Sequence, residues 1–211
     1  MLKILLVNHE PTVYDKTVLT LKENNFQNFT VIRAENGHDA LDRLTTGKFD
    51  FLLLDLDVAH TKTLAFILHV RHFYPHTPLI TFSFHMEYAI VRRYLTSGVN
   101  AYCLLEQNNY QEIIHAIERN RAGKVYISPV MIEYVASQAL YSRKNDRLHN
   151  LNTQEFDVLL HLKKQQPFSV IAGIFDVHVS TISFYKSRIL DKLRISDVPE
   201  LEHILKVDSV L

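Results

Sequence analysis

The chain has 211 residues, of which 47% are hydrophobic, so it is long enough for two packed domains and too apolar for a disordered protein. Its 23 basic and 23 acidic residues give a formal net charge of zero, which excludes a global field that would draw the chain to nucleic acid or to a membrane. The single cysteine excludes an internal disulfide, and no signal peptide or long apolar run is present, so we expect a cytoplasmic protein without membrane contact.

About the first 120 residues alternate between short apolar runs and segments with helical spacing. The expected strands are Lys3–Val7, Phe29–Arg33, Phe51–Asp55, Pro78–Phe82 and Ala101–Leu105. The expected helices are Thr12–Asn25, His38–Thr45, Thr63–Phe73, Met86–Leu95 and Tyr110–Arg121. Five strands alternating with five helices predict an α/β fold, a parallel sheet covered by helices on both faces.

In such a sheet the functional crevice lies beyond the carboxyl ends of the strands. The residues that the alternation places there are Asn8, His9, Asp55, Ser83, Leu105 and Glu106. Twelve histidines also raise the question of a metal site. However, His69 and His72 are only three residues apart, and His76 follows a proline, so we expect surface histidines and no metal site.

Three stretches resemble the receiver domain of response regulators: LLLDLD around Asp55, PLITFS ending at Ser83 and GVNAYCLL ending at Leu105. The resemblance covers about the first 120 residues. It implies that Asp55 stands at the phosphoacceptor position, Ser83 at the hydroxyl position of the fourth strand, and Tyr102 at the aromatic switch position of the fifth.

The charged positions of the receiver pattern are replaced in this chain. The family's acidic pair after the first strand, which helps to hold magnesium, reads Asn8 and His9, and the lysine that pairs with the phosphoryl group reads Leu105. Phosphoryl transfer depends on charge neutralisation and positioning, so most of the electrostatic machinery is missing. Because Mg²⁺ prefers oxygen ligands, we expect no Mg²⁺ or other cofactor, and a hydrogen-bonding role for Asp55.

Two alternatives for this pocket stay open. Glu10 or Asp57 could supply a missing carboxylate and keep the magnesium chemistry, although Glu10 would have to swing back by at least one residue. A protonatable His9 beside Asp55 could instead form a pH-responsive pair.

The stretch Pro129–Ser142 predicts a linker helix that is capped by Ser128 and has proline in its first turn. The following residues, Arg143–Asn150, are polar and lack an apolar period, so the boundary between domains falls there. The predicted division is a domain at 1–122, a linker at 123–148 and a second domain at 149–211.

The last sixty residues predict four short helices. Asn152 and Glu155 form a capping box before the first, and Pro167 begins the second, which ends at Phe175. After a turn at Asp176–His178, the third runs from Val179 to Leu193, and Asp197–Val207 supplies the fourth.

The third of these helices has two contrasting faces. The core-facing stripe consists of Ile182, Tyr185, Ile189 and Leu193. The opposite face and its flanks carry Ser180, Ser183, Phe184, Lys186, Ser187, Arg188 and Lys192. A helix in the DNA major groove needs short side chains near base edges, cations toward phosphates and an apolar group for a thymine methyl. An amphipathic helix with a merely solvated face explains the pattern equally well.

The stretches LNTQEFDVLLHL, IAGIFDVHVSTI and KSRILDKL resemble the LuxR-type helix-turn-helix domain of NarL-like response regulators. The resemblance implies base-facing positions at Ser183, Phe184 and Ser187, and phosphate-facing cations at Lys186, Arg188 and Lys192. It also places Thr181 near the helix start, where its hydroxyl and nearby backbone N–H groups can hold a phosphate.

This part of the chain also departs from its family. Ser183 stands where a lysine is common, and Phe168, Ser169 and Val170 stand where polar residues are usual, so Phe168 and Val170 either thicken a small core or contact a protein partner. Asp176 and Asp191 dilute the positive charge, so we expect modest, salt-sensitive DNA affinity and a need for dimerisation.

The sequence therefore predicts a DNA-binding transcription regulator of the response-regulator type, not an enzyme, that binds double-stranded DNA as a homodimer. Control is expected from expression level, a regulatory protein partner or ligand, or constitutive dimerisation. The dimer surface is expected on the receiver, on the last helix around Leu201 and Ile204, or on both. The alternatives are a phosphorylation-dependent two-component regulator and a protein-interaction module with a vestigial DNA domain.

Overall fold

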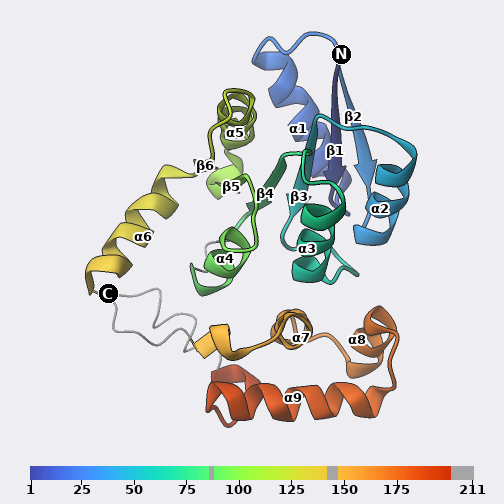
Figure 1. The fold of residues 1–211 in the computed structure, drawn as a ribbon, viewed down its shortest axis with the longest axis vertical. Helices are drawn as coiled ribbons and strands as arrows, with labels where there is room; N and C mark the ends of the chain where they lie inside the picture. The colour runs from blue at the N-terminus through green and yellow to red at the C-terminus, as the bar shows by residue number, and fades with distance from the viewer. Residues whose placement is uncertain (86–87, 142–146, 201–211) are drawn as a thin grey trace.

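Two structural parts follow one another in the computed structural model, which describes residues 1–85, 88–141 and 147–200 (Figure 1). The α/β part, residues 1–128, is a parallel sheet with helices on both faces, and the helical part, residues 147–200, is built from short helices. Helix α6 (Pro129–Tyr141) leads from one to the other. The predicted fold class is confirmed.

The sheet has one strand more than the sequence predicted. Its strands are β1 (Leu2–Val7), β2 (Phe29–Ala34), β3 (Phe51–Asp55), β4 (Leu79–Ser83), β5 (Ala101–Leu104) and β6 (Tyr126–Ile127). Among the described residues they pair in the order β2-β1-β3-β4-β5-β6, and each pair is parallel. The sequence analysis missed β6 because a strand of two residues is too short to be recognised from its pattern.

Helices cover both faces of the sheet. Helices α1 (Pro11–Glu23) and α5 (Gln111–Arg121) pack on one face, and their buried residues form one apolar cluster with those strand residues that point the same way. Helices α2 (Gly37–Thr46), α3 (Thr63–Phe73) and α4 (Tyr88–Leu95) belong to the other face. All residues of β3 and β4 are buried, as expected for central strands of a sheet that is covered twice.

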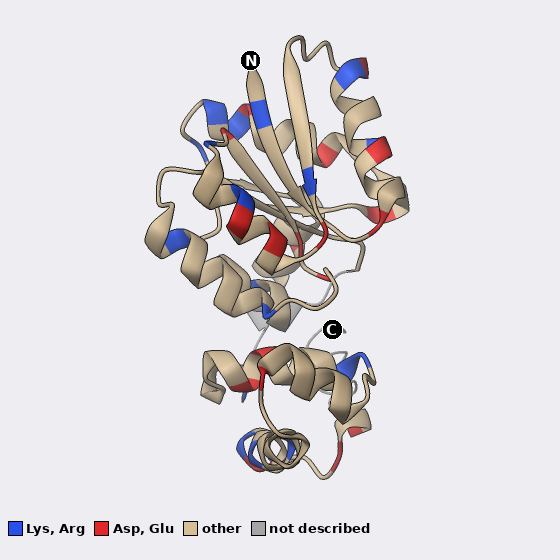
Figure 2. Cartoon of the chain, turned by 90° about the vertical axis from the view of Figure 1, so that its right-hand side faces the viewer, with Lys and Arg blue, Asp and Glu red and all other residues tan. Residues whose placement is uncertain are grey.

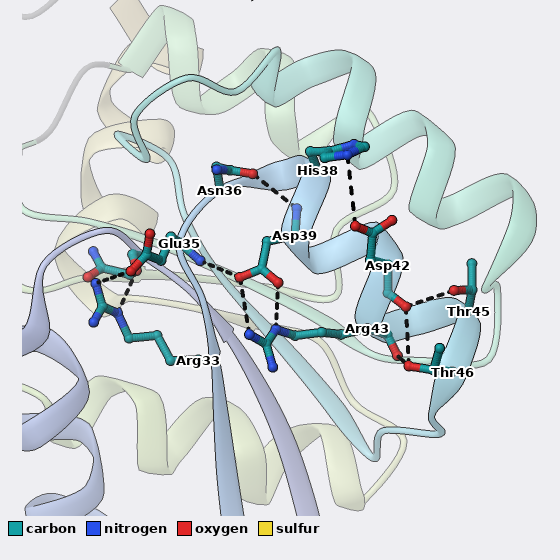
Figure 3. Close-up of polar contacts among 10 residues, drawn as sticks. Arg33, Glu35, Asn36, His38, Asp39, Asp42, Arg43, Thr45 and Thr46 are labelled. Carbon is teal, nitrogen blue, oxygen red and sulfur yellow. Dashed lines mark hydrogen bonds and ion pairs between the residues drawn. The ribbon is translucent and has the colours of Figure 1, made fainter.

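The start of α2 is fixed by a small polar network (Figure 3). The Asn36 side chain caps the helix by accepting the N–H of Asp39 at 3.0 Å, and Asp39 accepts the N–H of Glu35 and pairs with Arg43 at 2.8 Å. Partial burial raises the pKa of Asp39, but the bonds from Arg43 and Glu35 outweigh it and lower the pKa overall. The neighbouring Arg33 donates to the backbone carbonyls that follow β1 and so holds that loop.

The helical part follows the predicted order. It contains a 3₁₀ turn, η2 (Arg147–Asn150), and the helices α7 (Thr153–Lys163), α8 (Phe168–Phe175) and α9 (Val179–Leu193). The predicted capping box is present, because Asn152 and Glu155 each accept the other's backbone N–H. Among the described residues no single helix is long and apolar enough to cross a bilayer; α8 and α9 meet that test only as a pair bent by 99°.

The predicted linker helix is present as α6, which begins at Pro129, and the carbonyl of Ser128 accepts the N–H of Ile132 at 3.1 Å. The predicted cap by the Ser128 side chain is not formed, because its Oγ accepts the N–H of Leu104 at 2.8 Å and donates to the Glu112 carboxylate. The polar stretch before α7 contains η2, in which Leu148 is buried. The predicted fourth helix, Asp197–Val207, lies mostly outside the described residues, as do Leu201 and Ile204.

The two parts pack against each other through α7. This helix lies between the α3–α4 side of the α/β part and α9, which is on the far side (Figure 1). The rings of Tyr94 and Phe156 meet edge to face at 5.9 Å, and Arg93 donates to the carbonyl of Leu151 at 2.7 Å. Buried residues of the two parts therefore form one continuous apolar cluster.

Candidate functional site

The first candidate site is an acidic pocket at the carboxyl edge of the sheet. The strand order reverses between β1 and β3, so the ends of these neighbouring strands flank the crevice that the topology creates. Asp55 ends β3 and is only 3% exposed. Its carboxylate accepts the side-chain amide of Asn8 at 2.5 Å and the backbone N–H of Asp57 at 2.8 Å. The two expected neighbours, Asn8 and Asp55, are thus in direct contact.

Burial, together with the smaller effect of the Asp57 charge, raises the pKa of Asp55 to about 6, although the bonds from Asp57 N–H and Asn8 and the charge of Lys164 act to lower it. The carboxylate is therefore ionised at neutral pH but is held by amide donors. Among the described residues, Lys164, the C-cap residue of α7, is the one cation that contributes to this balance.

The residues that could have replaced the missing acidic pair contact other partners. The ring of His9 faces the N–H of Ala59 at 3.4 Å and the carboxylate of Glu10 at 4.0 Å, so the suggested pair between His9 and Asp55 is not formed among the described contacts. Glu10 is exposed and turned toward His9. The carboxylate of Asp57 forms an ion pair with Lys164 at 3.0 Å.

The expected switch residues are engaged with one another. Tyr102 is fully buried, and its hydroxyl lies 2.8 Å from the Ser83 Oγ, which itself donates to the carbonyl of His85 at 2.9 Å. Since a serine hydroxyl has one proton, Tyr102 must be the donor of the shared bond. Leu105 is 1% exposed and packs in the α1–α5 cluster, so an apolar side chain occupies the position expected for a lysine.

This set of donors does not fit Mg²⁺. The ion requires near-octahedral oxygen ligands, usually including carboxylates. Here the Asn8 carbonyl oxygen already accepts the N–H of Glu10 at 2.7 Å, its amide nitrogen faces Asp55, and Asp57 is paired with Lys164. Over the described ranges, no group of three or more His, Cys, Asp or Glu side chains could hold a metal ion.

The second candidate site is the exposed face of α9. Three residues of the predicted core stripe, Ile182, Ile189 and Leu193, are at most 1% exposed, whereas the fourth, Tyr185, is only half-buried. The exposed residues of the other face are Ser180, Ser183, Phe184, Ser187 and Arg188. Phe184 is 58% exposed, and the Arg188 guanidinium lies over its ring at 5.6 Å. One protruding aromatic ring is thus surrounded by short hydroxyl side chains.

The cations of α9 differ in how far they are already engaged. Lys192 donates to the Glu155 carboxylate at 2.6 Å, and Arg188 lies 3.4 Å from the same carboxylate, which is fully buried. Burial raises the pKa of Glu155, but Lys192 outweighs it and the pKa is lowered overall. The ammonium of Lys186 lies over the ring of Phe168 at 5.8 Å. Figure 2 shows basic and acidic segments side by side on α9, which is seen end-on.

The amino end of α9 contains a residue that the sequence analysis did not single out. His178 is the N-cap, and its Nδ1 accepts the N–H of Ser180 at 3.3 Å, while its carbonyl accepts the N–H of Thr181 at 2.9 Å. Histidine is not a usual cap, so composition gave no signal. Thr181 is therefore placed at the helix start, but its N–H is already bonded within the chain.

The apolar residues of α8 are only partly available to a partner. Phe168 packs against the core of the helical part, as the small-core alternative expected. Val170 is 38% exposed.

Comparison with known proteins places the chain in a family. A family profile of the response regulator receiver domain matches residues 4–118, more than half of the chain. The chain belongs to the response regulator family. This response regulator is 27% identical over 203 residues to the transcriptional activator protein ExaE of Pseudomonas putida, covering 95% of this chain and 94% of that protein. It is 23% identical to the response regulator UvrY of Escherichia coli K12, covering 81% and 78%.

Solved structures share the fold of both parts of this response regulator. RcsB of Salmonella enterica serovar Typhimurium, bound to promoter P1flhDC in the presence of the phosphomimetic BeF3⁻, has a TM-score of 0.74 at 16% identity and covers 97% of this chain and 98% of its own. A second RcsB structure has a TM-score of 0.77, with 98% of each chain covered. We refer below to the α/β part as the receiver domain.

Replacing Asp55 by asparagine should stabilise the protein at pH 7.5 but not at pH 4. The buried carboxylate has a pKa of about 6 in the folded state against 3.8 in the unfolded state, so the native protein loses stability as the pH rises from about 4 to 6. One pKa unit corresponds to about 1.4 kcal/mol, so wild type should lose about 2 to 3 kcal/mol relative to Asp55→Asn over this range. Urea unfolding at both pH values measures it, with the exposed Asp42→Asn as control for charge loss. If the free energies of unfolding of wild type and Asp55→Asn differed by the same amount at both pH values, the burial argument would be contradicted.

Proposed function

We propose that this response regulator is a DNA-binding transcription regulator that binds duplex DNA as a homodimer and works without aspartyl phosphorylation. The proposed division is a receiver domain at 1–122, a linker at 123–148 and a DNA-binding domain at 149–211. The observation that carries the proposal is the exposed face of α9, where short side chains surround Phe184 and cations lie at the edge. The promoter-bound RcsB structure and the activator ExaE support the same reading.

The face of α9 suits the major groove for steric and chemical reasons. Ser183 and Ser187 are short enough to let the helix backbone approach base edges, and their hydroxyls can donate or accept. Phe184 has no hydrogen-bonding group, so the thymine methyl is the group in the groove that it can bury. Lys186 and Arg188 flank this face, and we assign them to the phosphates.

The role of Lys192 is different in our proposal. Its ammonium is bonded to buried Glu155 and lies 3.4 Å from the carbonyl of Asn150. Removing one partner of such a contact leaves a buried charge without its main counter-ion, which is costly. We therefore assign Lys192 to fixing α9 on α7 rather than to a phosphate.

Limited positive charge explains why we expect a dimer. The chain has no net charge, and exposed Asp176 and Asp191 lie beside the proposed phosphate contacts. Each phosphate contact contributes through the release of counter-ions, so few contacts give weak binding at physiological salt. Two copies of α9 reading half-sites about one helical turn apart would combine two weak contacts.

The residues of the pocket support the proposed independence from phosphorylation. Asp55 is held by amide donors, Leu105 stands in place of a cation, and the Ser83 hydroxyl is bonded to Tyr102 and His85. A phosphoryl group on Asp55 would bring about two negative charges into a buried site whose nearby lysine, Lys164, is already paired with Asp57. The same geometry argues against catalysis, so the protein is not an enzyme in our proposal.

Replacing Lys186 by alanine should weaken binding to duplexes selected from genomic fragments. Loss of one phosphate contact per subunit should lower affinity about three- to tenfold and reduce the salt slope by about one per lost contact. Fluorescence anisotropy between low and moderate salt measures both, and Lys186→Ala with Arg188→Ala should bind still more weakly. The exposed receiver lysine in Lys124→Ala is the matched control. A wild-type protein that selects no duplex would support the protein-interaction alternative instead.

Phe184 should make the protein sensitive to a single thymine methyl. Replacing that thymine by deoxyuridine removes only the methyl group, which is worth about 0.8 kcal/mol or roughly fourfold in affinity. Wild type should bind less tightly when one particular thymine of each half-site is replaced by deoxyuridine. Phe184→Leu should still bind the thymine duplex more tightly than the deoxyuridine duplex, and Phe184→Ala should bind both equally. Equal binding of every deoxyuridine duplex by wild type would remove Phe184 from the base contacts.

Incubation with acetyl phosphate and Mg²⁺ should leave the mass of the protein unchanged, because the pocket lacks the charges that the transfer requires. Intact-protein mass spectrometry measures this, and beryllofluoride should not alter DNA affinity. An adduct that disappears in Asp55→Asn would instead establish the phosphorylation-dependent alternative.

A further inference from the structure

Helix α3 of the receiver begins without a cap from its own domain. The N-cap residue, Lys62, makes no side-chain hydrogen bond to the helix. The first N–H groups of a helix need acceptors, since no preceding turn supplies them. Here the N–H groups of Leu64 and Ala65 donate to the two carboxylate oxygens of Asp157, at 2.8 and 3.0 Å. The cap of a receiver helix is thus supplied by α7, 93 residues further along the chain.

Among the residues that the structure describes, Asp157 has no hydrogen bond within its own domain. Both hydrogen bonds that it makes among the described residues go to the receiver, although it is only 2% exposed. Burial raises its pKa to about 6, against the lowering effect of the two N–H donors and of Lys62. If the domains separated, the carboxylate would return to water. A buried charge with partners only across an interface acts on domain arrangement rather than on the stability of one domain.

Further contacts surround this cap. Lys62 lies over the ring of Phe175 at 5.1 Å, and Arg93 lies over the ring of Phe156 at 5.6 Å. At the carboxyl end of α7, Lys164 pairs with Asp57, whose N–H is bonded to Asp55. Helix α9 lies on the side of α7 that is away from the receiver (Figure 1).

We propose that Asp157 is an interdomain latch that holds α7 on the amino end of α3 and keeps α9 turned outward, so that the DNA-reading face is presented without chemical change at Asp55. The importance of the outward face rests on the proposed function. The latch itself does not, because it concerns only how the two domains are held.

Two contacts of the interface involve a carboxylate, and they should differ in strength. Asp157 is buried and accepts two N–H groups at a helix amino end, where the helix dipole also favours a negative charge. Lys164 and Asp57 are 37% and 48% exposed, so water and salt screen their attraction. Removal of Asp157 should therefore release the domains far more than removal of Lys164.

Pulsed dipolar spectroscopy on the full chain tests the latch. Spin labels are attached through Glu118→Cys on α5 and Gly173→Cys on α8, where an added side chain meets open space; buried Cys103 does not react. The double-labelled parent should give a narrow distance distribution. Asp157→Ala should broaden it about twofold or more, because domain motion is the default without a specific contact. Asp157→Asn should lie between them, since an amide keeps one acceptor oxygen.

Matched controls separate the latch from general damage. Exposed Asp42→Ala and Lys164→Ala should keep the narrow distribution, and alanine at position 157 should leave the helical content in circular dichroism unchanged. A distribution for Asp157→Ala as narrow as that of the parent would overturn the latch.

DNA affinity provides an independent measurement. If α9 is uncovered while the domains are docked, Asp157→Ala cannot bind a selected duplex more tightly than wild type. A gain of more than about threefold would mean that docking covers α9 and would overturn the outward orientation. If wild type binds no duplex, the proposed function fails, while the distance measurements still decide the latch.

Discussion

A buried carboxylate must find donors, and this constraint organises the molecule because three such groups meet it in three ways. Asp55 is held by an amide and a backbone N–H at the sheet edge. Asp157 accepts the free N–H groups of a helix in the other domain. Glu155 is surrounded by a capping N–H and the cations of α9. The first solution holds the carboxylate of the receiver pocket, the second joins the domains, and the third sets the position of the proposed recognition helix.

The first and second of these groups lie on the same side of the receiver. Helix α3 follows the loop after Asp55, so its amino end and the pocket share the carboxyl edge of the sheet. The helical part meets this edge with a carboxylate at α3 and an ammonium at Asp57. A lysine from another domain is thus the cation that acts on Asp55, while the receiver's own position for one holds Leu105. The pocket and the helical part are therefore connected through Lys164.

Local patterns in the sequence predicted the helices and strands, but they did not predict the contacts of side chains whose partners are far away in the chain. Helical spacing found both faces of α9, and strand alternation placed Asn8 beside Asp55, because both depend on neighbours along the chain or on parallel topology. The two-residue strand β6 had no periodicity to detect. A charge inside the apolar run FDVLL was the one signal for Asp157, but its partners are 92 and 93 residues away. Similarly, the sequence does not decide whether the Ser128 hydroxyl caps a helix or bonds to residues of other elements, because this depends on how the elements pack.

The capping carboxylate of α7 has a kinetic consequence for the proposed complex. Glu155 already attracts Arg188 at 3.4 Å, so a phosphate approaching that guanidinium competes with a partner that belongs to the protein. When the phosphate leaves, Glu155 is in place to receive the side chain again, and departure leaves no isolated charge. The contact should therefore exchange rapidly. Such a protein would spend short residence times on individual sites and sample many along a chromosome.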